Sequence, residues 1–213
     1  MNLLPNTSLL TVERLCFERD DCNVFEQIDL RVNAGDIVQI EGINGSGKTT
    51  LLRLLTTALQ PTSGTISYSG QSIDLCRYQY LSDILYLGHQ PAVKMTLTVA
   101  ENLRWMTAGS STCPETALVA VGLAGYVDVP CYSLSAGQHR RVALARLLMT
   151  DALVWFLDEP FTAIDKQGVG FLENCMRDHV KRGGAIVLSS HQDLRLDGVR
   201  KYQLMPHTDQ RGL

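Results

Sequence analysis

A glycine-rich segment at residues 42–50 constrains the fold more than any other feature of this sequence. The apolar run before it, 36–41, is predicted as a buried strand, and the run after it, 51–59, carries leucines at helical spacing. The segment fits the pattern G-x-x-x-x-G-K-[ST], whose glycines let successive backbone N–H groups converge on phosphate oxygens at a helix N-terminus. We therefore predict a phosphate-binding loop; the alternative is a plain glycine turn before a surface helix.

Individual residues of this loop have distinct expected roles. Lys48 would hold the β- and γ-phosphates of a nucleotide, and the Thr49 hydroxyl would coordinate Mg²⁺. Gly45 and Gly47 are suited to backbone angles that a Cβ would oppose. The residues expected to bind ATP in this segment are Gly42, Ile43, Asn44, Gly45, Ser46, Gly47, Lys48, Thr49 and Thr50.

Two adjacent carboxylates, Asp158 and Glu159, follow a second apolar run at 153–157. If that run is a buried parallel strand, its carboxyl end lies at the sheet edge where such folds bind ligands. Asp158 then suits a hold on the metal, and Glu159 suits a general base for an attacking water. Taken alone, the pair is equally well explained as a solvated acidic turn.

Strand-like and helical runs alternate along the chain, which predicts an α/β fold with a mostly parallel sheet covered on both faces. Residues 9–33 instead read as antiparallel strands with a turn at 20–23, and another short strand is expected at 65–68. The region 95–130 carries helix-start signals such as Thr98 before Glu101. With 213 residues, the chain is expected to form one domain spanning 1–213.

Composition excludes several classes of protein. The chain has 19 Lys and Arg against 22 Asp and Glu, so it lacks the net positive charge that is typical of nucleic-acid-binding proteins. The 6 cysteines include no C-x-x-C pair, and we expect reduced thiols rather than a metal site. The longest apolar stretch is far shorter than the roughly 20 residues that span a bilayer, and no secretion signal is recognisable.

The segment Leu134–Arg141 narrows the prediction, because two phosphate-site motifs alone establish only a nucleoside triphosphatase. It reads L-S-A-G-Q-H-R-R and resembles the signature motif, usually L-S-G-G-Q, of the ATP-binding cassette (ABC) ATPases. Ser135 is also suited to cap the helix that follows. The resemblance implies that Ser135, Ala136, Gly137 and Gln138 meet the ATP held by another subunit.

Other positions fall in the order typical of this family. Gln90 resembles the glutamine that links the metal and the attacking water to the helical subdomain, and His191 resembles the switch histidine at the γ-phosphate. Thr162–Asp165 resembles the D-loop, with Asp165 as its acidic residue. The resemblance implies that Gln90 joins Thr49 and Asp158 in binding Mg²⁺. It also implies that His191 acts with Glu159 in catalysis.

The family resemblance also implies an architecture and an assembly. It predicts a P-loop cassette with an N-terminal antiparallel β subdomain and an inserted helical signature subdomain at 91–150. Two copies would pair head to tail around two ATP molecules. Where the family usually stacks an aromatic ring on adenine, this sequence has Arg19, which can stack through its planar guanidinium.

Several segments, including Gly88–Lys94, Leu97–Leu103 and Asp158–Asp165, further resemble the haem-exporter ATPases of bacterial cytochrome c maturation. That resemblance implies a peripheral subunit on the cytoplasmic face of the inner membrane, docked on integral membrane subunits. It implies that ATP hydrolysis drives release of a haem-loaded periplasmic chaperone. Alternatives are another transporter's ATPase, a soluble ATPase of iron–sulfur assembly or translation, and a non-hydrolysing clamp.

Three residues near the start of the helical region are candidates for the membrane-partner surface. Leu103, Trp105 and Met106 could form an exposed apolar face that receives a helix of a membrane subunit. Packing inside the helical subdomain is an equally good explanation of the same residues.

Overall fold

The computed structural model of the protein describes residues 7–20, 22–107, 110–192 and 194–205. One sheet is antiparallel with strand order β2-β1-β4-β5, and the other is parallel with order β6-β7-β8-β3-β9. The strands are β1 (Ser8–Arg19), β2 (Cys22–Asn33), β3 (Ile37–Glu41), β4 (Ser63–Tyr68), β5 (Gln71–Ser72), β6 (Ile84–Leu87), β7 (Val154–Asp158), β8 (Ala185–Ser189) and β9 (Val199–Gln203). The helices are α1 (Lys48–Leu55), α2 (Ile73–Ser82), α3 (Val99–Met106), α4 (Pro114–Ala120), α5 (Ala136–Ala145) and α6 (Lys166–Lys181), with 3₁₀ turns at Cys131–Ser133 and Arg146–Leu148.

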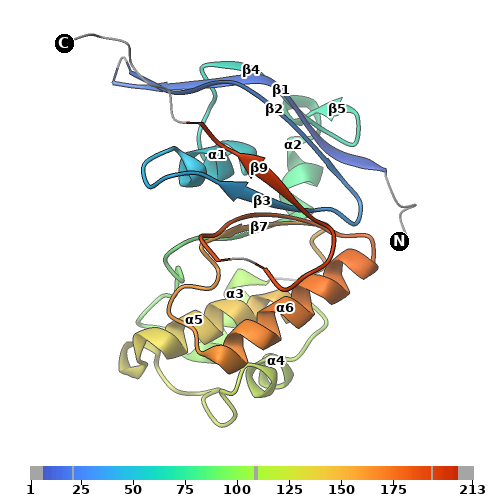
Figure 1. The fold of residues 1–213 in the computed structure, drawn as a ribbon. Coiled ribbons are helices and arrows are strands. Elements are labelled where there is room, and N and C mark those ends of the chain that lie inside the picture. Colours follow the sequence, from blue (N-terminus) through green and yellow to red (C-terminus); the bar gives the residue numbers. More distant parts are fainter. Residues whose placement is uncertain (1–6, 21, 108–109, 193, 206–213) are drawn as a thin grey trace, which may run out of the picture.

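The elements stack in layers, as Figure 1 shows. Helix α1 lies between the two sheets, and its Leu51, Leu52, Leu54 and Leu55 are completely buried in a core shared by both. Helices α3 to α6 lie on the other side of the parallel sheet, over a second core. Burial of each leucine side chain stabilises the fold by about 1.5–3 kcal/mol, so α1 is firmly anchored.

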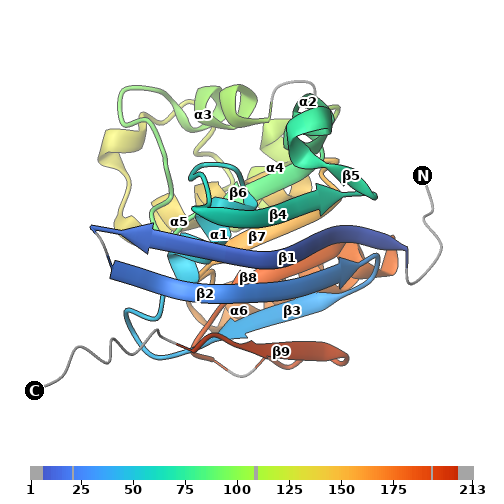
Figure 2. The ribbon, with the colours of Figure 1, turned by 90° about the horizontal axis from the view of Figure 1, so that it is seen from above.

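The parallel sheet confirms the predicted α/β architecture. Every residue of β7 and β8 is buried, as expected of strands with both faces covered. The long hairpin of β1 and β2 crosses over this sheet in Figure 2 and is antiparallel, also as predicted. Its strands extend into the predicted turn, because Arg19 pairs with Cys22; Asp21 lies outside the described residues.

Three elements differ from the prediction. Helix α1 ends at Leu55 instead of continuing to residue 59, since Thr57 adopts a left-handed φ of 59° that breaks the helical repeat. Helix α2 was not predicted, because its Leu75 and Tyr78 face solvent and blur the apolar periodicity. Strand β9 also carries no apolar signal, since it is a partly exposed edge strand.

The region predicted as helical contains α3, α4 and α5. Thr98 caps α3 through a reciprocal bond pair with Glu101, as the sequence pattern indicated. Of the three candidates for a partner surface, Leu103 is fully buried, Met106 is half-buried and Trp105 is 59% exposed. Within the described ranges, no helix combines the length and apolarity needed to cross a bilayer.

Candidate functional site

The glycine-rich loop leads from the end of β3 into the first turn of α1. Gly45 and Gly47 have φ values of 85° and 95°, the left-handed conformation that their lack of a Cβ permits. A Cβ on Gly47 would lie 2.8 Å from Val24 Cγ1, so the hairpin of β1 and β2 also packs closely over the loop. Because Gly47 is the N-cap of α1 and offers no side-chain cap, the N–H groups of the first turn remain available to an anion.

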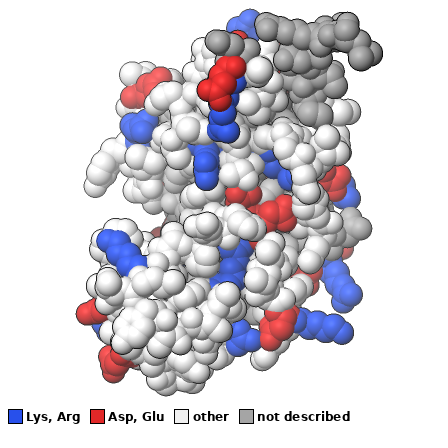
Figure 3. Space-filling model, turned by 90° about the vertical axis from the view of Figure 1, so that its left-hand side faces the viewer, with Lys and Arg blue, Asp and Glu red and all other residues white. Residues whose placement is uncertain are grey.

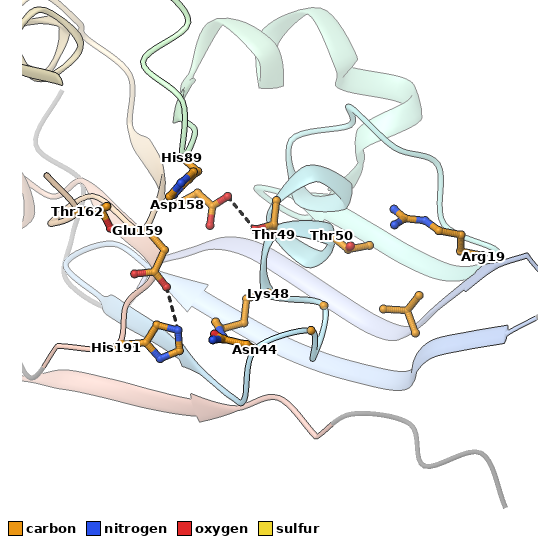
Figure 4. A pocket seen from close by; sticks show the side chains of 13 residues that line it. Arg19, Asn44, Lys48, Thr49, Thr50, His89, Asp158, Glu159, Thr162 and His191 are labelled. Carbon is orange, nitrogen blue, oxygen red and sulfur yellow. Dashed lines mark hydrogen bonds and ion pairs between the residues drawn. The ribbon is translucent and has the colours of Figure 1, made fainter. Parts of the chain in front are cut away.

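The Lys48 side chain lies back over this loop. Its ammonium group donates hydrogen bonds to the carbonyl oxygens of Gly42 at 2.8 Å and Ile43 at 3.2 Å. Figure 4 shows Lys48 beside Asn44, facing the same open space as Thr49. The loop therefore presents a positive charge and helix N–H groups on one side of the cavity, an arrangement suited to a triphosphate.

Asp158 joins three elements at the carboxyl end of the parallel sheet. Its side chain is 1% exposed, and Oδ2 accepts a hydrogen bond from Thr49 Oγ1 at 2.9 Å. Oδ1 accepts another from Ser189 Oγ at 2.7 Å, which fixes the carboxylate against β8. A hydroxyl and a carboxylate in contact, facing a phosphate-binding loop, are the hard oxygen donors that suit Mg²⁺ bound to a nucleotide.

Glu159 follows Asp158 with its carboxylate turned into the cavity. Its backbone has a left-handed φ of 47°, unusual for a residue with a Cβ. Its N–H donates to the Ser189 carbonyl at 3.2 Å and to Ser189 Oγ at 3.0 Å. Glu159 Oε1 lies 3.5 Å from His191 Nε2. A dashed line marks this pair in Figure 4, so a carboxylate and an imidazole converge beside the phosphate loop.

These groups line one open cavity of about 560 Å³, a size typical of small-molecule sites. Figure 3 shows a hollow on this face of the molecule, where basic and acidic side chains meet. The lining residues are Arg19, Val24, Asn44, Gly45, Gly47, Lys48, Thr49, Thr50, His89, Asp158, Glu159, Thr162 and His191. Arg19 lies at one end of the cavity, beyond Thr50 and away from Glu159.

Some predicted site residues lie outside this lining. Ser46 is 1% exposed, and Ile43 is 67% exposed, so both belong to the loop's framework or outer surface. Gln90 is exposed, and its neighbour His89 lines the cavity instead. His89 and Val24 were not predicted; His89 could have been found only from its place next to Gln90 at the end of β6.

The segment predicted to be the signature motif forms the N-terminus of α5, separate from the cavity. Ser135 caps α5 as predicted: Gln138 N–H donates to Ser135 Oγ at 3.3 Å, and Ser135 N–H donates to Gln138 Oε1 at 2.8 Å. Ser135 and Ala136 are exposed, and neither lines the cavity of this chain. A nucleotide bound by the same chain would therefore not meet them.

Asp165, the acidic residue of the predicted D-loop, caps α6. Asp165 Oδ1 accepts the Gly168 N–H at 2.9 Å at the start of α6, and its Oδ2 accepts a hydrogen bond from Arg141 at 2.8 Å. The Gly168 bond, together with the nearby positive charge of Arg141, lowers the pKa of the Asp165 carboxyl from its ordinary value. Asp165 is therefore an anchored anion that links α5 to α6.

Comparison with known proteins gives consistent results. The sequence model of the family described as ABC transporter matches residues 25–162. A protein of Hahella chejuensis, named cytochrome c biogenesis ATP-binding export protein CcmA, is 49% identical over 93% of this chain and 96% of its own length. The protein of the same name from Escherichia coli O157:H7 is 47% identical over 88% of this chain and 91% of its own.

Solved structures share the fold. An ABC transporter ATP-binding protein from Pyrococcus furiosus superimposes with a TM-score of 0.78 and 28% identity, covering 92% of this chain and 96% of its own. An ATP-binding subunit of an ABC transporter superimposes with a TM-score of 0.77 and 26% identity, covering 86% of this chain and 79% of its own.

Proposed function

This chain belongs to the ABC transporter family of ATP-binding proteins, and from that premise we propose that it is the ATP-hydrolysing subunit of a membrane complex of bacterial cytochrome c biogenesis. The observation that carries the proposal is the pairing of Glu159 with His191 beside the phosphate-binding loop. The assignment to cytochrome c biogenesis is supported by the 49% and 47% identity, over most of both chains, to proteins named for that process.

ATP would lie along the cavity with its triphosphate on the first turn of α1. Lys48 would leave the Gly42 and Ile43 carbonyls to contact the β- and γ-phosphates, since its ammonium already lies at the loop. The backbone of residues 42–50 would donate to the remaining phosphate oxygens. The adenine would then extend toward Arg19, whose guanidinium is a flat stacking surface at the far end.

Mg²⁺ would be held by Thr49 and Asp158 together with phosphate oxygens, with Gln90 contributing from the exposed segment after β6. It would neutralise phosphate charge as the reaction proceeds. The existing hydrogen bond between Thr49 Oγ1 and Asp158 Oδ2 holds these two donors side by side before the metal arrives.

Hydrolysis would then require a water held by Glu159. The carboxylate accepts the water's proton as the water oxygen bonds to the γ-phosphorus, and the bond from that phosphorus to the β–γ bridging oxygen breaks, giving ADP and phosphate. His191 lies close enough to Glu159 to orient it and to contact the γ-phosphate. The intact acid and histidine disfavour a non-hydrolysing clamp.

A second copy of the chain would complete the site. Ser135, Ala136, Gly137 and Gln138 are presented at the start of α5, away from their own chain's cavity. In a head-to-tail pair they would donate to the γ-phosphate bound by the partner. ATP would close this pair and hydrolysis would open it, because the two states differ in their affinity for ATP.

A groove beside α3 is our candidate surface for the membrane subunits. It has a volume of about 450 Å³ and combines the apolar side chains of Leu81, Trp105 and Met106 with polar ones that include Asp151. Arg146 also lines it, and its buried Nε has no hydrogen-bond partner among the described residues. A partner helix that carries both apolar and polar side chains would fit this lining, and would keep the chain at the cytoplasmic face of the inner membrane.

The proposal is tested in the source bacterium by replacing the gene with its Lys48→Ala form at matched expression. We expect mature c-type cytochromes to disappear from a haem stain while the periplasmic chaperone retains haem, since ATP hydrolysis no longer drives its release. An Arg104→Ala strain is the control. Normal cytochromes in the Lys48→Ala strain would exclude this process and favour an ABC ATPase of another transporter or of iron–sulfur assembly.

A further inference from the structure

Arg140 is a buried arginine that joins the signature helix to two other parts of the chain. It lies on α5 and is 2% exposed. Its Nη1 donates to the carbonyl oxygens of Gly88 at 3.0 Å and His89 at 3.3 Å, just after β6. Its Nη2 donates to the carbonyl oxygen of Glu159 at 2.8 Å. One guanidinium therefore bridges α5, the segment after β6 and the residue proposed as general base.

The partners of this guanidinium are backbone carbonyls rather than carboxylates. Burial lowers the pKa of Arg140, while the nearby charges of Asp158 and Glu159 favour its charged form. Burying a cation without a directly bonded anion is costly. This cost is offset when the N–H groups of the planar guanidinium point directly at hydrogen-bond acceptors. Neither lysine nor glutamine has the donor geometry to bond all three carbonyls at once.

The hydrogen bond from Arg140 is accepted by a residue, Glu159, whose backbone is strained. With its φ of 47°, Glu159 keeps this conformation only if its surroundings hold it. Ser189 accepts from the Glu159 N–H, and Arg140 donates to the Glu159 carbonyl, so the residue is held on both sides. The Thr162 N–H also reaches that carbonyl, at 3.2 Å, but from the same loop. Arg140 is thus the link from this residue to α5.

We propose that Arg140 is a positioning residue that makes the orientation of Glu159 depend on the placement of the signature helix. This inference rests on the proposed function, because it assigns Arg140 to the same hydrolytic site. Hydrogen bonds weaken steeply beyond about 3.5 Å, so a displacement of α5 from β7 by about 1 Å would release the Glu159 carbonyl. Hydrolysis would then proceed only when α5 is docked, which ties the reaction to whatever moves the helical elements.

The adjacent arginine does not share this arrangement. Arg141 pairs with Asp165 at 2.8 Å on a partly exposed surface and donates to the Val121 carbonyl, without a contact to Glu159. Arg104 on α3 is a better control for experiments. Its side chain is 59% exposed, and its ion pair with Glu115 is long, at 3.7 Å.

The test uses the full chain purified with Arg140→Gln, Arg140→Lys or Arg104→Gln. We expect Arg140→Gln to lower kcat by about 10-fold or more while KM and the dissociation constant for ATP change by less than about threefold, because positioning acts on the transition state. Arg140→Lys should recover part of kcat, since it keeps one charged donor. Arg104→Gln should match the wild type.

A double variant separates positioning from general damage to the fold. If Arg140 acts through Glu159, Arg140→Gln should cause little further loss in a Glu159→Gln background, since interacting residues are not additive. Equal fold-losses in both backgrounds, or unchanged kcat in folded Arg140→Gln, would overturn the proposal. If Arg140→Gln does not fold, the same comparison is made with Arg140→Lys. Wild-type hydrolysis by Glu159→Gln alone would instead reject the proposed function's general base.

Discussion

Thr49 on α1 and Asp158 at the end of β7 share a hydrogen bond of 2.9 Å between Oγ1 and Oδ2, although 109 positions separate them in the chain. The bond connects the helix that follows the phosphate-binding loop to the strand that carries the acidic pair. Since Asp158 also accepts from Ser189, a single buried carboxylate holds α1, β7 and β8 at the same point. The alignment of the two proposed metal donors therefore depends on this carboxylate.

We predict that Thr49→Val, which removes the hydroxyl and keeps the side-chain shape, abolishes the Mg²⁺-dependent part of ATP binding. The rate of hydrolysis should fall by about 100-fold, as expected when a metal position is lost. Titrating a fluorescent ATP analogue with and without Mg²⁺ measures this. Thr56→Val, at the end of the same helix, is the control; equal Mg²⁺ dependence in Thr49→Val and the wild type would contradict the assignment.

Glu159→Gln should retain ATP but hydrolyse it about 100-fold more slowly, because the amide cannot accept the water's proton. The slow variant should also accumulate as a dimer when ATP is added, since the closed pair no longer opens. Steady-state phosphate release and size-exclusion chromatography with ATP measure both effects. A variant as fast as the wild type would remove Glu159 from the reaction.

Arg19→Ala should weaken ATP binding by about fivefold, corresponding to about 1 kcal/mol for a stacked cation. The maximal rate should stay unchanged, because Arg19 lies at the opposite end of the cavity from Glu159. Affinities for ATP and GTP, compared with those of an Arg31→Ala control on β2, measure the effect. Unchanged affinities in Arg19→Ala would exclude a contact with the base.

His179 should make folding stability depend on pH. Its ring stacks on Trp155 at 3.8 Å between centroids, and Nε2 lies 3.2 Å from the Leu153 carbonyl. Burial lowers the pKa of His179 to about 4. Above pH 6.5 both the folded and unfolded states hold the ring neutral, so its contribution is complete. As the pH falls toward 4 only the unfolded state gains the proton, and stability declines by up to about 1.4 kcal/mol per pH unit.

The His179→Phe variant tests this dependence, because phenylalanine preserves a ring at the same place but cannot bind a proton. Chemical denaturation at several pH values between 7 and 4 would show a shallower decline for the variant than for the wild type. Parallel declines would mean that the imidazole does not distinguish the folded from the unfolded state.

The parts of this fold that could be predicted are those specified by local sequence. Short patterns predict the φ angles of Gly45 and Gly47 and the caps at Thr98 and Ser135. They also predict the buried strand, expected at 153–157 and found one residue later. Such features depend on backbone geometry or on residues three apart, so a single stretch of sequence contains the whole signal.

The remaining parts depend on contacts distant in sequence. The end of α1 at Leu55 and the edge strand β9 carry no local pattern strong enough to define them. The same holds for the site. No local pattern shows that His89 rather than Gln90 lines the cavity. That Arg140 reaches Glu159 follows only from how α5 packs against the sheet. A doublet of arginines does not reveal which of the two is buried.

The order of strands in the parallel sheet has a consequence for synthesis of the chain. β3, which leads into the phosphate-binding loop, is made early, but its two neighbours in the sheet are β8 and β9, the last strands of the described residues. During translation β3 therefore has no partner strand until residues beyond 184 have left the ribosome. A nascent chain therefore cannot assemble the triphosphate site until β8 has emerged, and ATP can stabilise the fold only from that stage on.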